Sequence, residues 1–284
     1  MYMSWKDLRY NTMRRFFTHN EMLKEMYNGF FTDFLDDLDN FKINQEGGGK
    51  KLEIKYKGHK IKFRCKLHKK ELDVYLTNLV GSRNCVMVTV DKKKKVANIS
   101  GLEIDPIKGC FDEPILNNGT TLMEATIKVL EKINKENYEE YQIDTIELTD
   151  NSYLYCDKET ISLSELSFLQ YGTTFYGRWG FYPKSEKKCK KYKRSQEKLF
   201  KFKVKDLDLK DFIKNKYEGN VTKTIEKIKK DYKKNKEEVF VNWFRGISKK
   251  YMRKECEFFD ELIEYIIRIF DLKIYKKEVF VKKL

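Results

Sequence analysis

Apolar and polar residues alternate with a period of two along residues 51–104, and this pattern predicts a series of β-strands. Turn residues interrupt the alternation, so we expect about five antiparallel strands with one buried and one solvated face. The strand over 96–104 should end at Asp105-Pro106, because proline cannot donate to a β-ladder. The alternating apolar positions are Leu52, Ile54, Tyr56, Ile61, Phe63, Cys65, Leu67, Leu72, Val74, Leu76, Val86, Val88 and Val90.

The period changes to that of a helix over residues 119–137, where one face is apolar. Thr120 or Thr121 can cap its start, with Glu124 placed for a reciprocal bond. A strand is expected at 142–149. Strand, helix and strand after an antiparallel meander predict an α/β fold, with a mixed and mostly antiparallel sheet and one crossover helix.

Helical patterns flank this core on both sides. An apolar stripe predicts a helix over 5–40, and Glu46–Lys50, with three consecutive glycines, is interpreted as a flexible joint. A helix is expected over 162–176, further helices follow position 184, and Val279-Phe280-Val281 favours a short final strand. The chain therefore divides into a helical N-terminal segment (1–45), an α/β core (46–183) and a basic, mainly helical C-terminal segment (184–284).

Charge changes the picture of possible partners. The formal net charge is +15, which favours polyanions such as nucleic acid, acidic protein or a phosphate-rich cofactor. Residues 184–205 hold eleven basic residues against Glu186 and Glu197, and three aromatic residues interleave with them: Tyr192, Phe200 and Phe202. Phosphate neutralisation and base stacking use these residue types, so this segment is a candidate contact for nucleic acid or an acidic protein. A solvated surface enriched in lysine by coding bias explains the same charge equally well.

The six cysteines form no CxxC pair and the chain has three histidines, so no metal site is expected. Scattered cysteines are typical of reduced, buried thiols in a reducing compartment, which favours a cytoplasmic protein without disulfides. The first residues lack the apolar stretch of a secretory signal. No apolar run reaches the ~18–20 residues that a membrane helix needs, so no membrane contact is expected.

The order of elements in residues 51–183 resembles the GNAT superfamily of acyl-CoA-dependent N-acetyltransferases. A meander precedes the glycine-led helix start Asn117-Asn118-Gly119-Thr120-Thr121, a strand follows, and a helix leads into Phe175-Tyr176-Gly177-Arg178-Trp179-Gly180-Phe181. The last segment is similar to the family's F-Y-x-x-x-G-F pattern. The family's phosphate loop reads Q/R-x-x-G-x-G/A, and of its glycines only Gly119 has a counterpart here, with Asn117 in the place of the first.

The resemblance implies acetyl-CoA as cofactor and an amine as acceptor. A helix N-terminus offers unpaired N–H groups to a pyrophosphate, and the residues in that place are Asn118, Gly119, Thr120 and Thr121. By the same resemblance the strands at 96–104 and 142–149 part to admit the pantetheine. Tyr176 would protonate the leaving thiolate, and Glu103, or Asp105, would act as general base. Asp150-Asn151-Ser152 would lie at a strand end facing this cleft.

Three functions follow from these patterns. The first is acetyl transfer to an amine by direct attack, in an active or a degenerate enzyme. The second is a basic nucleic-acid-binding module. The third is a non-catalytic assembly protein that reuses the fold, such as a component of a viral particle. Abundant Lys, Asn, Ile, Tyr and Phe with few alanines is typical of AT-rich genomes, among them those of large DNA viruses.

Overall fold

The computed structural model describes residues 44–46, 49–77, 81, 83–103, 109–136, 141–156 and 159–284. The helix predicted over 5–40 lies outside the described residues. The flexible joint predicted at 46–50 is wrong in part, because Glu46 pairs with Gly49 and both belong to strands of one hairpin. The second of these strands begins at Gly49 and continues through the alternating apolar residues Leu52, Ile54 and Tyr56.

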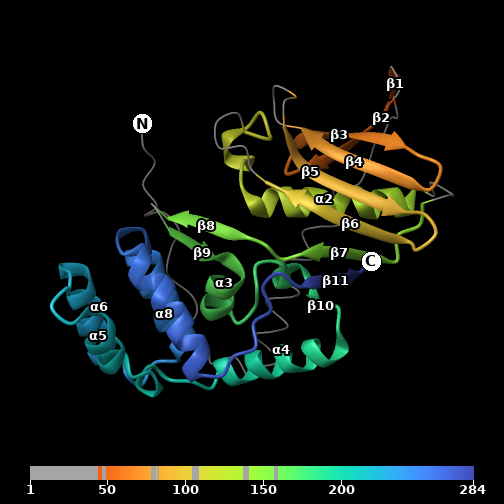
Figure 1. The fold of residues 1–284 in the computed structure, drawn as a ribbon. Coiled ribbons are helices and arrows are strands. Elements are labelled where there is room, and N and C mark those ends of the chain that lie inside the picture. The colour runs from red at the N-terminus through yellow and green to blue at the C-terminus, as the bar shows by residue number, and fades with distance from the viewer. Residues whose placement is uncertain are drawn as a thin grey trace.

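A nine-stranded sheet forms the centre of the described structure, in the order β1-β2-β3-β4-β5-β6-β7-β11-β10 (Figure 1). Neighbouring strands are antiparallel except β6 and β7, which run parallel. The strands are β1 (Asn44–Glu46), β2 (Gly49–Tyr56), β3 (His59–Leu67), β4 (Glu71–Thr77), β5 (Asn84–Asp91), β6 (Val96–Leu102), β7 (Thr145–Thr149), β10 (Tyr182–Pro183) and β11 (Val279–Lys283). The mixed, mostly antiparallel α/β fold expected from the sequence is thus confirmed.

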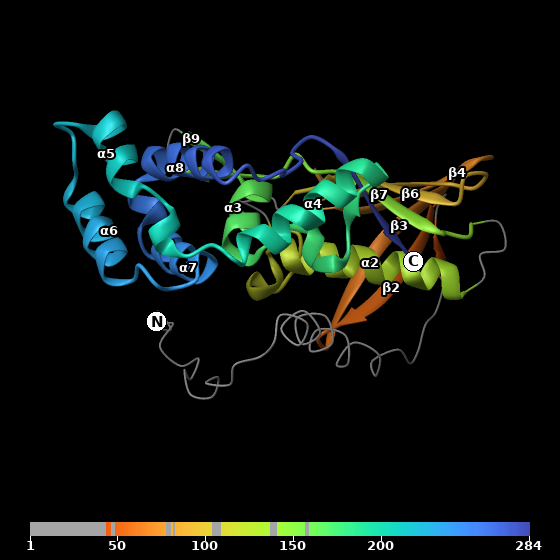
Figure 2. The ribbon, with the colours of Figure 1, turned by 90° about the horizontal axis from the view of Figure 1, so that it is seen from below.

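Helix α2 (Gly119–Lys135) is the crossover between β6 and β7, as predicted, and covers one face of the sheet (Figure 2). Ten of its residues are buried, including Leu122, Val129 and Ile133. This apolar face packs on the inward positions of the meander, such as Phe63 and Val88, and forms one continuous core with them.

The chain then leaves the sheet and builds a helical part (Figure 1). Its elements are the hairpin β8 (Tyr153–Cys156) and β9 (Glu159–Ser162), and the helices α3 (Leu163–Tyr171), α4 (Glu186–Leu199), α5 (Leu209–Tyr217), α6 (Lys223–Lys234), α7 (Phe240–Tyr251) and α8 (Cys256–Ile269). A second core, rich in aromatic side chains such as Phe240, Phe244 and Phe259, holds these elements together.

Helix α3 is shorter than the predicted 162–176. Ser162 caps its start by accepting from the backbone N–H of Glu165. Gly172 ends it with a φ of +73°, the left-handed conformation typical of a helix C-terminus. A Cβ at Gly172 would lie 2.4 Å from the Phe200 ring, so only glycine fits there.

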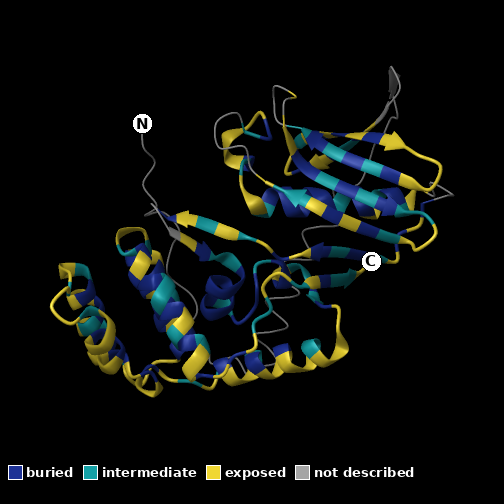
Figure 3. Cartoon of the chain, in the orientation of Figure 1, coloured by how far each residue is buried: buried dark blue, intermediate teal, exposed yellow. Residues whose placement is uncertain are grey.

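Strand β11 brings the end of the chain back into the sheet, between β7 and β10. Phe280, fully buried, joins the first core from this strand, and its ring lies 6.2 Å from that of Tyr192 in α4. The helical part therefore begins and ends at the sheet, and Figure 3 shows buried positions continuing from one part into the other.

Two disulfides correct the expectation of reduced thiols. Cys85 in β5 bonds to Cys110, and Cys156 in β8 bonds to Cys256 at the start of α8, with Cα–Cα distances of 6.0 and 5.7 Å. The partners are 25 and 100 residues apart in sequence, and only the folded sheet and helices bring them together. The sequence argument for a reducing, cytoplasmic compartment loses its support, because disulfides persist chiefly in oxidising surroundings.

Among the described residues, no helix combines the length and apolar character that crossing a membrane requires. In the same residues, no three His, Cys, Asp or Glu side chains gather as a metal site.

Candidate functional site

Strands β6 and β7 part at their C-terminal ends. Their parallel ladder runs from Val96–Thr145 to Ile99–Leu148 and stops there, although β6 continues to Leu102. The pairing of β6 with β5 also shifts at this level, between Met87 and Val88. Meanwhile β7 keeps its partner β11 up to Thr149. The described backbone of β6 after Ile99 is thus without a partner in β7, at the end of the sheet where α2 begins (Figure 1).

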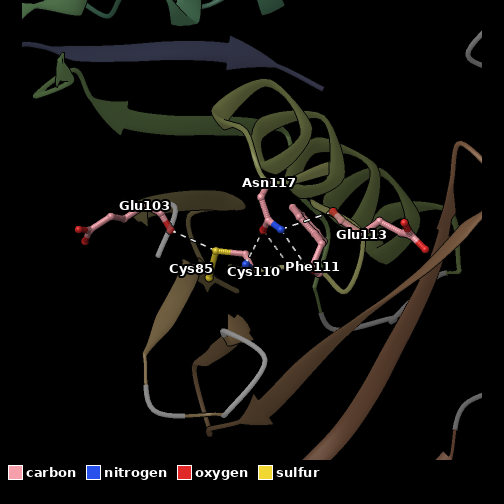
Figure 4. The surroundings of a disulfide bond; sticks show 6 residues. All are labelled: Cys85, Glu103, Cys110, Phe111, Glu113 and Asn117. Carbon is pink, nitrogen blue, oxygen red and sulfur yellow. Dashed lines mark hydrogen bonds between the residues drawn. A yellow bond between two sulfur atoms is a disulfide. The ribbon is translucent and has the colours of Figure 1, made fainter. Parts of the chain in front are cut away.

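Two asparagines, Asn118 and Asn117, hold the start of α2, and Figure 4 shows the hydrogen bonds of Asn117. The Asn118 side chain accepts from the backbone N–H of Thr121 at 2.9 Å and donates to the Ile115 carbonyl at 3.0 Å. Asn117 fixes the preceding loop, since its side chain accepts from the N–H of Cys110 and Phe111 and donates to the Phe111 carbonyl. The N–H groups of Gly119 and Thr120 precede the helical ladder, so they are the ones left for an external acceptor.

Gly119 lies beneath an aromatic side chain. A Cβ at this position would be 3.3 Å from Cζ of Phe175, tighter than nearly all real contacts. The Arg178 guanidinium lies over the same Phe175 ring, 5.9 Å from its centroid, and stacks more closely on Tyr171 at 4.2 Å. The segment around Tyr176 thus brings the Phe175 ring to the first turn of α2, and the Arg178 guanidinium lies over that ring.

Tyr176 begins the short 3₁₀ turn Tyr176–Trp179 and is 9% exposed. Its ring lies 5.2 Å from that of Phe175 and 6.5 Å from that of Phe181, both edge to face. Burial, and then the negative charge of Asp150, raise the pKa of the Tyr176 phenol well above its ordinary value. The side chain therefore stays protonated over a wider pH range than an ordinary tyrosine.

Asp150 directly follows β7 and is the most unusual group of the site. It is 1% exposed, and among the described residues its Oδ2 has no hydrogen-bond partner. Its Oδ1 accepts from the hydroxyl of Ser152 at 2.6 Å and from the Ser152 N–H at 3.2 Å. Burial raises the pKa of this carboxyl, against the opposing effect of the Ser152 bonds. An unpaired buried carboxylate is costly, so it points to a functional role.

Glu103 lies just past the end of β6, but its side chain is exposed. Figure 4 shows its carboxylate pointing away from Asn117 and from the Cys85–Cys110 disulfide. Its negative charge acts on Tyr155, whose pKa is raised first by the hydrogen bond with Tyr153 and also by Glu103. The alternative base, Asp105, lies outside the described residues.

The structure therefore brings together four of the features that the sequence singled out: the parting strands, the start of α2 at Asn118–Thr121, Tyr176 and Asp150. Asp150 was noted only as a residue facing the cleft, without a role. Sequence could place it at a strand end, but its burial and its unpaired oxygen depend on β11. The two residues just before β11 cover Asp150: its backbone N–H donates to the Glu278 carbonyl, and the Lys277 N–H donates to the Asp150 carbonyl.

A separate cavity of about 210 Å³ lies in the helical part, between α6 and α7. Asp231, Glu238, Trp243, Lys250 and Tyr251 line it, together with residues of α7. Burial, and then the charge of Asp231, raise the pKa of Glu238. None of the residues around Asp150 and Tyr176 lines this cavity, so it is not part of the candidate site.

The aromatic residues of 184–205 have a structural role. Tyr192 is fully buried, accepts from the N–H of Thr174 at 2.9 Å and belongs to the second core. Phe200 and Phe202 pack against the same core, and Phe202 stacks on Phe270 with a centroid distance of 3.8 Å. These rings are therefore not available for base stacking, in contrast to the sequence-based expectation.

The chain matches no known protein-family model, no curated protein and no solved structure. The function must be inferred from the site itself.

Proposed function

We propose that this protein is an acyl-CoA-dependent N-acyltransferase of the GNAT type, with its site between the parted ends of β6 and β7. The observation that carries the proposal is this parting at the N-terminus of the crossover helix, with Tyr176 and Asp150 beside it. A parallel pair that separates leaves backbone groups free to bind an extended, amide-containing chain such as pantetheine. The order of elements and the F-Y-x-x-x-G-F-like segment support the same reading.

The residues present suit a CoA pyrophosphate. The N–H groups of Gly119 and Thr120 and the positive end of α2 favour phosphate oxygens. A glycine at 119 lets the Phe175 ring pack directly over the first turn of α2, because a Cβ there would lie only 3.3 Å from its Cζ. Arg178, whose guanidinium lies over the Phe175 ring, supplies a cation that the loop sequence itself lacks. When bound, the cofactor supplies an acyl group activated as a thioester.

The protein's own groups then divide the proton transfers. The acceptor amine forms the new C–N bond at the acyl carbon as the C–S bond breaks, so the amine must lose a proton and the departing sulfur must gain one. Tyr176, kept protonated by burial and by Asp150, donates to the sulfur. A carboxylate takes the proton of the amine. Asp150, with a raised pKa and an unpaired oxygen, is the stronger candidate for this role than the exposed Glu103.

Activity assays with single variants test this assignment. Release of CoA from acetyl-CoA would be followed chromatographically with a panel of primary amines. Tyr176→Phe should lower kcat by about 10²-fold or more, the usual contribution of a positioned acid or base. Tyr141→Phe is the matched control, because this buried tyrosine follows the opposite end of α2 and its hydroxyl donates to the backbone carbonyls of His68 and Glu71.

The two carboxylates are separated by the same assay. Asp150→Asn should lower the rate as strongly as Tyr176→Phe, whereas Glu103→Gln should leave most of it. If Glu103→Gln lowers the rate more than Asp150→Asn does, the role of general base belongs to Glu103. Wild-type protein that releases no CoA with any amine, yet is folded, would favour the non-catalytic assembly role.

A further inference from the structure

The net charge of the chain is confined to one part of the molecule. Residues 184–284 contain 32 Lys and Arg against 17 Asp and Glu, a net +15, whereas residues 1–183 contain 27 of each. Lysine-rich coding bias acts on the whole chain, so it does not by itself explain a neutral first part and a basic second part. The segregation indicates that the helical part meets a polyanion.

Helix α4 carries a regular row of exposed cations. Lys187, Lys191, Arg194 and Lys198 follow one another at steps of four, three and four residues, which places them on one face of the helix. Other lysines of α4 form ion pairs, Lys188 with Glu278 and Lys190 with Glu186. Tyr192 and Leu199 anchor a different face of α4 in the second core, whereas the four residues of the row are exposed.

Helix α6 repeats the same spacing. Lys223, Lys227, Lys230 and Lys234 again follow steps of four, three and four residues, and all four are exposed. Glu226 of this helix forms an ion pair with a fifth lysine, Lys229. Ile225, Ile228 and Tyr232 bury the other face. Two helices of the same helical part thus present matching cation rows.

The length of each row suits a nucleic-acid backbone. Eleven residues of helix span ~16 Å at 1.5 Å per residue. A strand of duplex DNA carries one phosphate per ~3.4 Å of axis, so one row faces roughly five phosphates. Each exposed lysine or arginine that neutralises a phosphate releases a condensed counterion, which drives association without reading sequence.

We propose that the exposed faces of α4 and α6 form a binding surface for the phosphate backbone of nucleic acid, independent of base sequence. Base stacking is excluded on α4 because Tyr192, Phe200 and Phe202 pack in or against the core. An anionic membrane is the poorer partner, because both helices bury their apolar faces in the protein and have none to insert between lipids. The surface does not depend on the acyltransfer site.

Fluorescence anisotropy with a labelled random-sequence duplex of about 30 base pairs, titrated between about 50 and 300 mM salt, tests the proposal. One variant carries K187Q, K191Q, R194Q and K198Q, and a second carries K223Q, K227Q, K230Q and K234Q. The control variant carries K55Q, K62Q, K66Q and K69Q, four exposed lysines of the β2–β3 region. All three lose the same charge, and glutamine is a good helix former, so each should keep the thermal stability of the wild type.

Each helix variant should bind the duplex at least about 10-fold more weakly at low salt, and its salt slope should be shallower by up to ~3.6, about 0.9 for each lost contact. The control should change the slope by less than about 1, and two duplexes of different sequence should bind alike. Equal losses in all three variants would overturn the proposal, as would absence of binding at low salt. Equally tight, equally row-dependent binding of poly-glutamate or of phosphatidylserine vesicles would also overturn it, in favour of those partners.

Discussion

A carboxylate that is buried with one oxygen unpaired destabilises the folded state, and Asp150 is held in this condition by its own neighbours. Ser152 satisfies only Oδ1, while Lys277 and Glu278, just before β11, pair with the backbone N–H and carbonyl of Asp150. Such groups are typical of sites that give up stability for chemistry. Burial first, and then the charge of Asp150, raise the pKa of Tyr176, so the two groups lie in one buried environment.

The pH dependence of stability measures this cost. The folded-state pKa of Asp150 is raised above its unfolded value, so the unfolded carboxyl ionises first. Stability should therefore fall as the pH rises from about 4, the unfolded pKa, through the raised folded pKa. Asp150→Asn removes the ionisable group, so this fall in stability disappears. The melting temperature of the variant, relative to that of the wild type, should therefore rise over this pH range. Parallel curves of the two proteins, recorded by circular dichroism, would show that Asp150 is not a strained ionised group.

At the scale of single elements, periodicity predicted most of the fold. Alternation and helical stripes are local patterns. They were sufficient to predict the meander, α2, the strand before Asp150 and the final strand at 279–281. The end of α3 at Gly172 was missed although its signal is local, because a glycine in the left-handed conformation commonly ends a helix. The hairpin at Glu46–Gly49 was missed because consecutive glycines are typical of a linker. The burial of Asp150 and the core role of Tyr192 also come from long-range contacts.

The disulfides belong to the same scale, since each ties an element to a distant one. Cys85–Cys110 joins β5 to the loop that Asn117 organises, next to the start of α2 (Figure 4). Cys156–Cys256 joins the β8–β9 hairpin to α8. Neither bond could be predicted from the sequence, because its cysteines are not closely spaced.

Mass spectrometry checks both bonds. Alkylation of the denatured protein without reductant should leave Cys85, Cys110, Cys156 and Cys256 unmodified, and the same treatment after reduction should label all four. Reduction should also lower the melting temperature, because each bond restricts the unfolded chain by a contribution on the order of 2–4 kcal/mol. Labelling of these four cysteines before reduction would contradict the pairing.

For the whole molecule, β11 is the element on which the two cores depend. The chain returns from the helical part to complete the sheet, and Phe280 fills the first core from there. Phe280→Ala should therefore destabilise the protein by about 3–5 kcal/mol, the usual range for a buried phenylalanine. Val279→Ala, at a neighbouring and partly exposed position, should cost less than about 1 kcal/mol. Chemical denaturation of both variants measures the two losses in the free energy of unfolding. Equal losses would mean that Phe280 does not hold β11 in the sheet.

Thermal unfolding with and without millimolar acetyl-CoA tests the central claim most directly, with ATP as the control for phosphate binding to a basic surface. Ligand at about 100 times its dissociation constant stabilises by ~2.7 kcal/mol, which is roughly 5 °C or more for a chain of this size. Acetyl-CoA should give this shift and ATP should not. Gly119→Val should abolish it by closing the space against Phe175, while Gly246→Val, with no atom within 4 Å of its Cβ position, should retain it. Equal shifts with both ligands, or none with acetyl-CoA, would contradict an acyl-CoA site between β6 and β7.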